Sequence, residues 1–357
     1  MNIEKLKAAL ADKDFAALIY SEENRRYFTS FPSSDGWLLV TAEKAVFFTD
    51  SRYIEAAQQQ CEGCDEILLF ERLSKSVKPV IESLKIEKIA VEASRMTLSA
   101  LSSVEKALGA EFVTDSSLDD IIDSIRIKKS ESEIELIVKA QRIAEKAFEH
   151  ICDFIKVGMT EKEIGLELDY FMLKNGADAL SFETIAICGE KTSMPHGVPG
   201  ENRVKEGDFV TMDYGAVCGG YHSDMTRTVA VGFATDEMKE IYNTVLSAQK
   251  AAFPLMKPGV PCSDVDKAGR DVIEKAGYGK YFGHSLGHGV GVEIHEMPSV
   301  SPRSDNILEE GYVITDEPGI YIPGKFGVRI EDMAYITNDG YRNLTEAPKE
   351  LIILNNR

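Results

Sequence analysis

Four carboxylates stand in or beside apolar segments that are typical of buried strands. Asp213 lies within the run 209–215, Glu317 lies in a similar run that begins at residue 312, and Asp224 and Glu331 open the strand-like segments that follow. A buried carboxylate is costly unless a cation or several donors accompany it, and converging carboxylates repel one another and take up protons. A divalent cation removes both problems, so these acids predict a metal site. The alternative is that each acid only caps a turn.

Three of the six histidines fall within a 12-residue window that is rich in glycine. His284 and His288 lie in the segment 282–291, which holds four glycines, and His295 follows seven residues after His288. So many glycines argue against a helix and favour a chain that approaches another group closely. His196 lies in another loop-like stretch, 194–200. A lone histidine is usually an ordinary surface or core residue, whereas clustered histidines beside glycines favour a functional site.

These residue types together indicate a hydrolytic metal centre. Carboxylate and imidazole ligands suit Mn, Co, Fe or Zn, and an oxygen-rich set favours manganese. Four carboxylates and one imidazole suffice for two metal ions if some carboxylates bridge them. Two such ions lower the pKa of a water molecule that they share, which makes it a nucleophile near neutral pH. The other histidines could bind or protonate a polarised carbonyl group and stabilise its oxyanion, so hydrolysis of an amide or ester is expected.

The segments that must position these residues repeat along the chain. Residues 156–159 resemble 257–260, and residues 174–176 resemble 275–277, both at an offset of 101, while 206–215 resemble 310–319 at an offset of 104. In this frame Asp213 falls opposite Glu317. Chance similarity of short segments is the alternative, but three anchors in the same order favour a duplication. The sequence therefore predicts two related α/β halves, each contributing two acids on neighbouring strands.

Residues 1–125 are expected to form a separate α/β domain, and residues 126–357 the domain that carries the site. Apolar runs at 16–20, 37–40, 45–48 and 67–70 predict strands, and the patterns at 1–10, 51–60, 76–84 and 98–108 predict helices. Ser130 and Glu133 have capping-box spacing and open a long amphipathic helix. The first domain contains no histidine, so few catalytic groups are expected there.

Composition excludes several classes of function. Acidic residues outnumber basic ones by 59 to 40, and this formal net charge of −19 argues against a nucleic-acid partner or an anionic membrane surface. No stretch approaches the ~20 apolar residues of a membrane helix, and the N-terminus lacks a signal-like apolar segment, so a cytoplasmic protein is expected. The six cysteines are then interpreted as reduced thiols. Cys61 and Cys64 have CxxC spacing without a thioredoxin-like setting, so we interpret them as loop thiols whose role stays open.

From about residue 130 to its end, the chain resembles the pita-bread metallopeptidases, which include methionine aminopeptidase, prolidase and aminopeptidase P. The resemblance is specific because five ligand positions recur in order with their flanking residues. It implies an α+β pita-bread fold with an internal pseudo-two-fold duplication after the N-terminal α/β domain. The matching stretches are 195–197 (PHG), 212–215 (MDYG), 223–228 (SDMTRT), 283–291 (GHSLGHGVG), 295–296 (HE), 317–321 (EPGIY) and 328–332 (VRIED).

The resemblance implies a role for each metal ligand. Asp213 and Asp224 would bind metal, with Asp224 bridging the two ions. His288 and Glu317 would bind mainly one ion, and Glu317 would also relay the proton of the attacking water. Glu331 would bridge the ions on the other side. The implied cofactor is a pair of divalent ions, Mn²⁺ first, with Co²⁺ or Zn²⁺ as alternatives.

The resemblance also implies residues that meet the substrate. His284 and His295 would contact it and stabilise the tetrahedral intermediate. His196 would bind substrate or shuttle protons, and Arg329 would support a ligand or meet a substrate carboxylate. Two residues depart from the family pattern: His222 is interpreted as supporting or exposed, and Asp316 should point away from the site by strand alternation.

The N-terminal domain separates the subgroups of this family. Methionine aminopeptidases generally lack it, and the stretch 50–53 (DSRY) resembles the N-terminal domains of Xaa-Pro peptidases. Cleavage of the Xaa-Pro bond at the free N-terminus of short peptides by a homodimer is therefore expected. The alternatives are a catalytically inactive binding module on the same fold, a methionine aminopeptidase-like activity, and metal-free hydrolysis of a creatine-like C–N bond. Dipeptidase and aminopeptidase P activities share all these motifs.

Overall fold

The computed structural model describes residues 2–355. The chain divides into two compact units, Met1–Arg126 and Ile127–Arg357. Among the described helices, none combines the length and the hydropathy that crossing a lipid bilayer requires.

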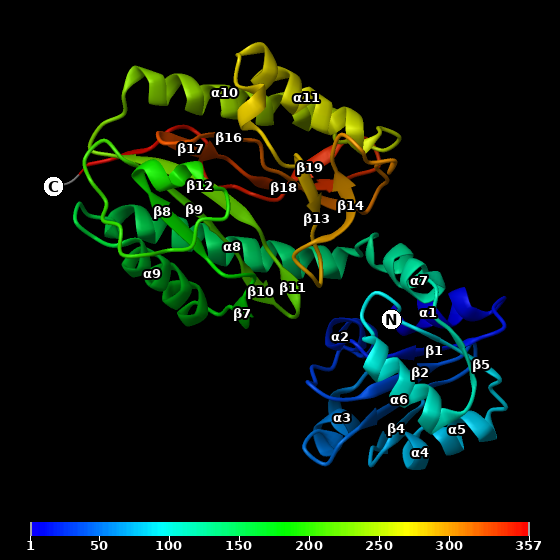
Figure 1. The fold of residues 1–357 in the computed structure, drawn as a ribbon. Helices are drawn as coiled ribbons and strands as arrows, with labels where there is room; N and C mark the ends of the chain where they lie inside the picture. Colours follow the sequence, from blue (N-terminus) through cyan, green and yellow to red (C-terminus); the bar gives the residue numbers. More distant parts are fainter. Residues whose placement is uncertain (1, 356–357) are drawn as a thin grey trace. The chain divides into compact units, whose positions relative to one another are not determined.

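The N-terminal unit is built on one six-stranded sheet with the order β4-β3-β2-β1-β5-β6 (Figure 1). Its strands β1, β2 and β3 are buried along their whole length and are apolar apart from Thr49 at the end of β3, as the sequence pattern predicts. The strands are β1 (Ala16–Ile19), β2 (Trp37–Val40), β3 (Ala45–Thr49), β4 (Glu66–Leu69), β5 (Lys88–Val91) and β6 (Glu111–Val113), and the helices are α1 (Asn2–Leu10), α2 (Glu22–Thr29), α3 (Ile54–Gln60), α4 (Leu73–Ser76), α5 (Lys78–Ser83), α6 (Leu98–Leu108) and α7 (Ser117–Arg126).

Two predicted helices of this unit differ from the observed ones for local reasons. Helix α3 begins at Ile54 and not at Ser51, because Asp50 accepts a hydrogen bond from the backbone N–H of Arg52 (2.8 Å) and holds the chain in a turn. The helix predicted over 76–84 is two short helices, and Pro79 lies in the first turn of the second one, where its missing N–H costs nothing.

The C-terminal unit places two helices along each side of its central strands: Figure 1 shows α10 and α11 on one side and α8 and α9 on the other. Its first helix begins at the predicted capping box, in which the backbone N–H of Ser130 donates to Glu133 (2.8 Å). The remaining elements are α8 (Glu131–Phe154), α9 (Glu161–Lys174), β7 (Ala179–Leu180), β8 (Ile185–Cys188), η1 (Gly189–Ser193), β9 (Phe209–Tyr214), β10 (Ala216–Cys218), β11 (Tyr221–His222), β12 (Met225–Val231), α10 (Asp236–Ala252), η2 (Phe253–Leu255), α11 (Cys262–Lys275), η3 (Gly279–Tyr281), β13 (Gly287–Gly289), β14 (Glu296–Val300), β15 (Val313–Asp316), β16 (Gly319–Ile322), β17 (Phe326–Arg329), β18 (Asp332–Ile336), β19 (Tyr341–Asn343) and β20 (Ile353–Leu354).

The predicted duplication is confirmed in the local geometry of this unit. Both ends of α11 lie 101 residues after the corresponding ends of α9. Each helix follows a glycine with positive φ, Gly158 (91°) or Gly259 (85°), where a side chain would strain the backbone. The N–H of Gly158 donates to Val204 and that of Gly259 to Leu308, both at 2.8 Å. The two halves therefore repeat the same hydrogen bonds, which short chance similarity does not explain.

Each half also contains one central antiparallel strand pair. In the first half β9 pairs with β12, in a four-stranded sheet with the order β20-β12-β9-β8. In the second half β15 pairs with β18, in a five-stranded sheet with the order β14-β13-β15-β18-β19. The two pairs are joined where the N–H of Glu331 donates to Thr226 (3.1 Å). The acids at these strands are thereby brought to one place.

Candidate metal centre

All nine residues that the sequence singled out line one cavity of about 770 Å³ in the C-terminal unit. This volume falls within the range of small-molecule sites in proteins. An apolar wall that includes Phe182, Ile185 and Ile294 stands beside the polar groups. The nine are Asp213, Asp224, Glu317, Glu331, His196, His284, His288, His295 and Arg329.

The four carboxylates come from the two central strand pairs. Asp213 lies within β9, and Asp224 directly precedes its partner β12. Glu317 directly follows β15, and Glu331 directly precedes β18. The side chains of Asp224 and Glu331 are almost fully buried, and those of Asp213 and Glu317 are mostly buried. Equivalent strand ends in the two halves therefore deliver two acids each to one buried place.

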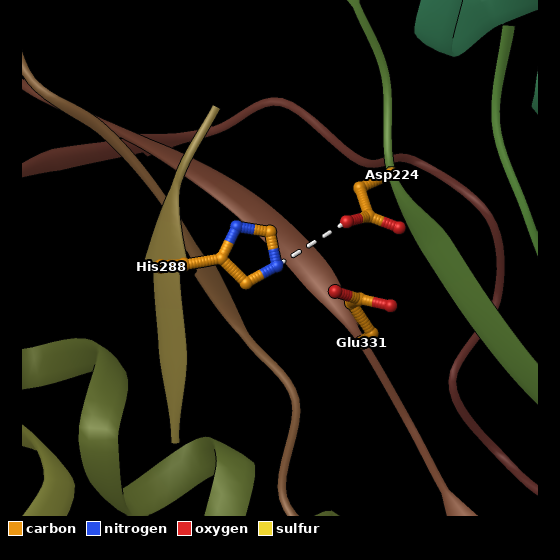
Figure 2. A group of neighbouring side chains, drawn as sticks. All are labelled: Asp224, His288 and Glu331. Atoms are coloured by element: carbon orange, nitrogen blue, oxygen red, sulfur yellow. Dashed lines mark ion pairs between the residues drawn. The ribbon is translucent and has the colours of Figure 1, made fainter. Parts of the chain in front are cut away.

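His288 faces these acids in a fixed orientation (Figure 2). Its Nδ1 lies 3.0 Å from the carbonyl oxygen of Gly289, so Nδ1 carries the hydrogen and Nε2 presents a lone pair. Nε2 lies 3.5 Å from Asp224 Oδ2 and 3.5 Å from Glu317 Oε1. The glycines on either side of His288 let neighbouring backbone approach β13 closely, because a Cβ at Gly287 would lie 2.1 Å from the carbonyl oxygen of Thr315 and one at Gly289 would lie 2.2 Å from that of Met297.

Electrostatics in the cavity disfavour charge on the acids. Burial, reinforced by the charge of Asp213, raises the pKa of Asp224 well above its usual range, and burial with the charge of Asp224 does the same for Glu331. Burial also raises the pKa of Glu317 to about 8. Burial lowers the pKa of His288 to about 4, so its imidazole is neutral at pH 7. Bound cations would reverse the raised carboxylate pKa values, since they favour the charged form.

The donor set fits a divalent cation. One ligand atom each from Asp224, His288 and Glu331 lies within 4.8 Å of the others. Two ligands that bind one ion at about 2.1 Å stand roughly 3.0–3.4 Å apart, close to the 3.5 Å separations around His288 Nε2. Asp213 Oδ1 is buried and has no hydrogen-bond partner in the protein. An uncompensated buried oxygen of this kind is what a metal ion would satisfy.

Arg329 holds Asp213 and is fully engaged within the protein. Its guanidinium donates to Asp213 Oδ2 (2.6 Å), to Thr226 Oγ1 (3.0 Å) and to the hydroxyl of Tyr321 (2.9 Å). Its side chain is 4% exposed. Of the two roles that the sequence left open, this geometry favours support of a ligand over contact with a substrate carboxylate.

Tyr321 extends this chain of hydrogen bonds to His284. Because its oxygen accepts from Arg329, its O–H donates to His284 Nε2 (2.9 Å). His284 Nδ1–H donates in turn to the carbonyl of Ser285 (2.7 Å). Burial lowers the pKa of His284 to about 4, so the ring is neutral at pH 7. Tyr321 belongs to a motif that the sequence identified, yet no spacing indicated this contact.

The loop that carries His196 is anchored by a buried carboxylate. Glu161, at the start of α9, accepts hydrogen bonds from the N–H groups of Cys188 (3.0 Å) and Gly200 (2.8 Å). It also accepts one from the ammonium of Lys191 (2.7 Å). The loop is therefore held at both ends, while His196 itself is exposed within the cavity wall.

The loops that carry the other two substrate-facing histidines are anchored in the same way. Asp266 accepts from the N–H of Leu286 (3.0 Å), and its partner Arg270 donates to the carbonyl of His284 (2.8 Å). Glu296, next to His295, forms a buried ion pair with Lys129 (3.0 Å). The rings of His295 and His288 lie 4.3 Å apart. These anchoring contacts were missed by sequence reasoning because each one joins a charged side chain to a loop that is remote from it along the chain.

His222 and Asp316 lie outside the residues that line the cavity. His222 Nδ1 forms a hydrogen bond with Ser181 Oγ (2.8 Å). Asp316 is fully buried at the end of β15, opposite Asp332, and burial raises its pKa well above the usual range. Strand alternation thus directs Asp316 away from the metal centre.

Comparison with known proteins agrees with this geometry. The profile of metallopeptidase family M24 matches residues 135–338, and that of the creatinase/prolidase N-terminal domain matches residues 2–128. The Xaa-Pro dipeptidase of Pyrococcus horikoshii is 40% identical over 94% of each chain. The solved structure of an Xaa-Pro dipeptidase from Bacillus anthracis superposes with a TM-score of 0.94 at 43% identity, over 99% of both chains.

A second solved structure carries a different activity in its name. The X-Pro aminopeptidase from Thermotoga maritima superposes with a TM-score of 0.89 at 37% identity, over 95% of this chain and 97% of that one. The predicted fold class, an α/β domain followed by a duplicated pita-bread domain, is confirmed by these similarities. The chain therefore belongs to metallopeptidase family M24 and is a metallopeptidase.

Proposed function

We propose that this metallopeptidase hydrolyses the Xaa-Pro bond at the free N-terminus of short peptides with two divalent metal ions. The observation that carries the proposal is the convergence of five metal-binding side chains in one buried cavity. Four carboxylates against one imidazole favour manganese among the divalent ions. The ligands are Asp213, Asp224, His288, Glu317 and Glu331.

Different residues of the cavity carry out proton transfer, substrate binding and stabilisation of the oxyanion. Bound there, the ions would supply Lewis-acid polarisation of the scissile carbonyl and would acidify a water molecule. Glu317 accepts the proton of the attacking water at its carboxylate and returns it to the leaving proline nitrogen. His295, beside His288, and His196 on the opposite loop bind the substrate carbonyl and stabilise the developing oxyanion. His284 is held by Tyr321 in position for the same task.

The specificity for proline is supported by the names of the relatives and by the cavity wall. The relatives named above cleave Xaa-Pro bonds according to their names. Proline places an apolar ring at the scissile nitrogen. The apolar side chains of Phe182, Ile185 and Ile294 offer such a ring a surface to pack against. A complete ligand set argues against an inactive binding module.

The test compares peptides on the full-length protein after metal removal and refilling with Mn²⁺. At least one of Ala-Pro and Ala-Pro-Ala-Ala should release alanine, whereas Ala-Ala and Met-Ala-Ser should not. Turnover of the dipeptide alone would assign a dipeptidase, and turnover of the tetrapeptide would assign an aminopeptidase P. An absence of turnover with Mn²⁺, Co²⁺ and Zn²⁺ would refute the proposed function, and preferential cleavage of Met-Ala-Ser would support a methionine aminopeptidase.

The resemblance further leads us to propose that the chain forms a homodimer. Light scattering on the purified full-length chain tests the assembly, because a dimer doubles the mass of 39.5 kDa. A monomeric mass at the concentration of the activity assay would contradict it.

A further inference from the structure

Cys61 and Cys64 form a close pair of thiols in the N-terminal unit, which contains none of the residues assigned to hydrolysis. Cys61 caps the C-terminus of α3, and Cys64 stands just before β4. The two Sγ atoms lie 3.5 Å apart, and both residues are half-buried. In Figure 1, α3 lies next to β4, which is the strand at one edge of the six-stranded sheet. The pair is therefore both close enough to react and open to small molecules.

The backbone holds this pair together without a covalent link. The N–H of Cys61 donates to Ala57 (2.9 Å), and that of Glu62 donates to Thr29 (2.8 Å). Gly63 takes a positive φ of 74°, which lets the chain turn tightly between the two cysteines. Rotations of the two side chains would bring the sulfurs to bonding distance, about 2.05 Å, with little movement of the backbone.

The other four cysteines provide an internal contrast. Burial raises the pKa of Cys152 and of Cys188 to about 12, that of Cys262 to about 11, and that of Cys218 above its usual value. Within the described part of the chain, no other pair of cysteine sulfurs forms a contact like the one between Cys61 and Cys64. Buried lone thiols of this kind are poor nucleophiles.

A metal site is the other use of a CxxC pair, and the surroundings do not favour it. A structural zinc ion takes four ligands, usually cysteine and histidine. In residues 2–355 the one group of three or more suitable ligand atoms is that of Asp224, His288 and Glu331. The N-terminal unit contains no histidine. Two sulfurs without further ligands suit thiol–disulfide exchange better than metal binding.

We propose that Cys61 and Cys64 are a redox-active dithiol that low-molecular-weight disulfides convert reversibly to an intramolecular disulfide. Cys61 is the attacking group. The contact between the two sulfurs lowers the pKa of the Cys61 thiol and raises that of Cys64. Because this site shares no residue with the metal centre, the inference stands independently of the proposed function.

The exchange balances as two successive displacements. The Cys61 thiolate attacks one sulfur of a disulfide RSSR, which forms a mixed disulfide and releases the first RS⁻. The Cys64 thiol, after losing its proton to solvent, attacks Sγ of Cys61 and releases the second RS⁻. The two cysteine sulfurs are oxidised, and one RSSR is reduced to two RSH.

The test uses the full-length protein in buffers with stepped ratios of reduced to oxidised glutathione. Acid quenching, alkylation and peptide mass spectrometry then report each cysteine. We expect the peptide that contains both cysteines to lose two hydrogens in one step. The ratio of disulfide to dithiol form should fall with the square of the reduced glutathione concentration at a fixed concentration of oxidised glutathione. Cys152, half-buried and unpaired, should stay alkylated in the same samples and serves as the internal control.

Two single variants identify the attacking thiol. C64S should accumulate a glutathione adduct on Cys61 at least tenfold faster than C61S accumulates one on Cys64. Persistence of two alkylated thiols in excess oxidised glutathione would overturn the proposal, as would equal adduct formation at both positions. Zn²⁺ that is retained in a 1:1 ratio by the wild-type chain and lost in C61S would also overturn it.

Discussion

At the scale of single residues, the orientation of the ligands is set by their own hydrogen bonds. His288 donates to the carbonyl of Gly289, which fixes the tautomer that presents Nε2 to the acids. Arg329 holds Oδ2 of Asp213 and leaves Oδ1 without a partner. Residue types and motifs were enough to predict which side chains lie together in this cavity. The contacts that orient them were not predictable, because they depend on side-chain geometry and not on spacing.

Loss of a single ligand should remove metal and activity together. Asp224→Asn and His288→Ala each delete a donor from the closest ligand group, so bound metal and kcat should both fall by more than about 100-fold. Metal content by mass spectrometry and turnover of Ala-Pro measure the two quantities. Asp236→Asn, on the exposed start of α10, and His150→Ala, on α8, are the matched controls. Unchanged activity in both ligand variants would refute the assignment.

Replacement of Arg329 by lysine should lower activity although the charge is kept. Lysine cannot reproduce the three hydrogen bonds to Asp213, Thr226 and Tyr321, so Asp213 loses its fixed orientation. We expect a decrease of about 10–100-fold in kcat, with a much smaller change in KM. Arg342→Lys, at an exposed position, should retain full activity. A change in KM alone would instead show that Arg329 binds the substrate.

At the scale of elements, three loops are anchored by ion pairs that lie on other segments of the chain. The clearest is Lys129 with Glu296, whose side chains are 1% and 6% exposed and which fixes the loop that bears His295. Lys129 stands in a two-lysine cluster, so its sequence gives no sign that it differs from Lys128. The α and β elements were largely predictable from their periodicity, whereas such pairs were not.

The neighbouring lysines should differ sharply in their effect on stability. Lys129→Met removes the ammonium that forms an ion pair with the buried Glu296 and should cost about 3–5 kcal/mol of unfolding free energy. Lys128→Met breaks an exposed pair with Glu309 (2.6 Å) and should cost at most about 1 kcal/mol. Urea unfolding measures both values. Equal losses would show that the buried pair has no special role.

A double variant separates stability from loop position. The double variant Lys129→Met/Glu296→Met removes both charges of this buried pair, so much of the lost stability should return. Turnover of Ala-Pro should stay reduced, because the loop that carries His295 has lost its anchor. Recovery of full activity with stability would indicate that the pair supports only folding.

At the scale of the whole molecule, duplication explains how a large negative charge is concentrated at one site. The offsets of 101 and 104 residues made the two related halves predictable, each with two acids at its central strands. The joining of the halves at Glu331 and Thr226 was not predictable, because no repeat indicates which strand ends meet. The cavity that results gathers residues from position 169 to position 331.

This concentration of acids makes stability depend on pH and metal together. In the metal-free protein, burial raises the pKa of Glu317 from its ordinary value of 4.5 to about 8, so the folded state retains a proton that the unfolded chain has released. The folded state is therefore most stable, with respect to this group, below pH 4.5, and it loses that stability as the pH rises from 4.5 to 8. Burial also raises the pKa values of Asp224 and Glu331, so these two groups make stability depend on pH in the same direction.

The difference in Tm between Mn²⁺-saturated and metal-free protein should thus widen as pH rises from 5 to 8. Bound cations stabilise the ionised carboxylates, so the Mn²⁺-saturated protein should not lose stability in this way as the pH rises. Differential scanning calorimetry across this range measures the difference. A constant difference, or one that narrows toward pH 8, would contradict the electrostatic account of the cavity.

The most direct measurement is anomalous diffraction from a crystal of the full-length protein grown with Mn²⁺. The account predicts two anomalous peaks in the cavity, both in contact with Asp224 and Glu331, with His288 and Glu317 on one ion and Asp213 on the other. The absence of peaks at saturating Mn²⁺, or peaks bound by other residues while these five side chains stay free, would contradict it.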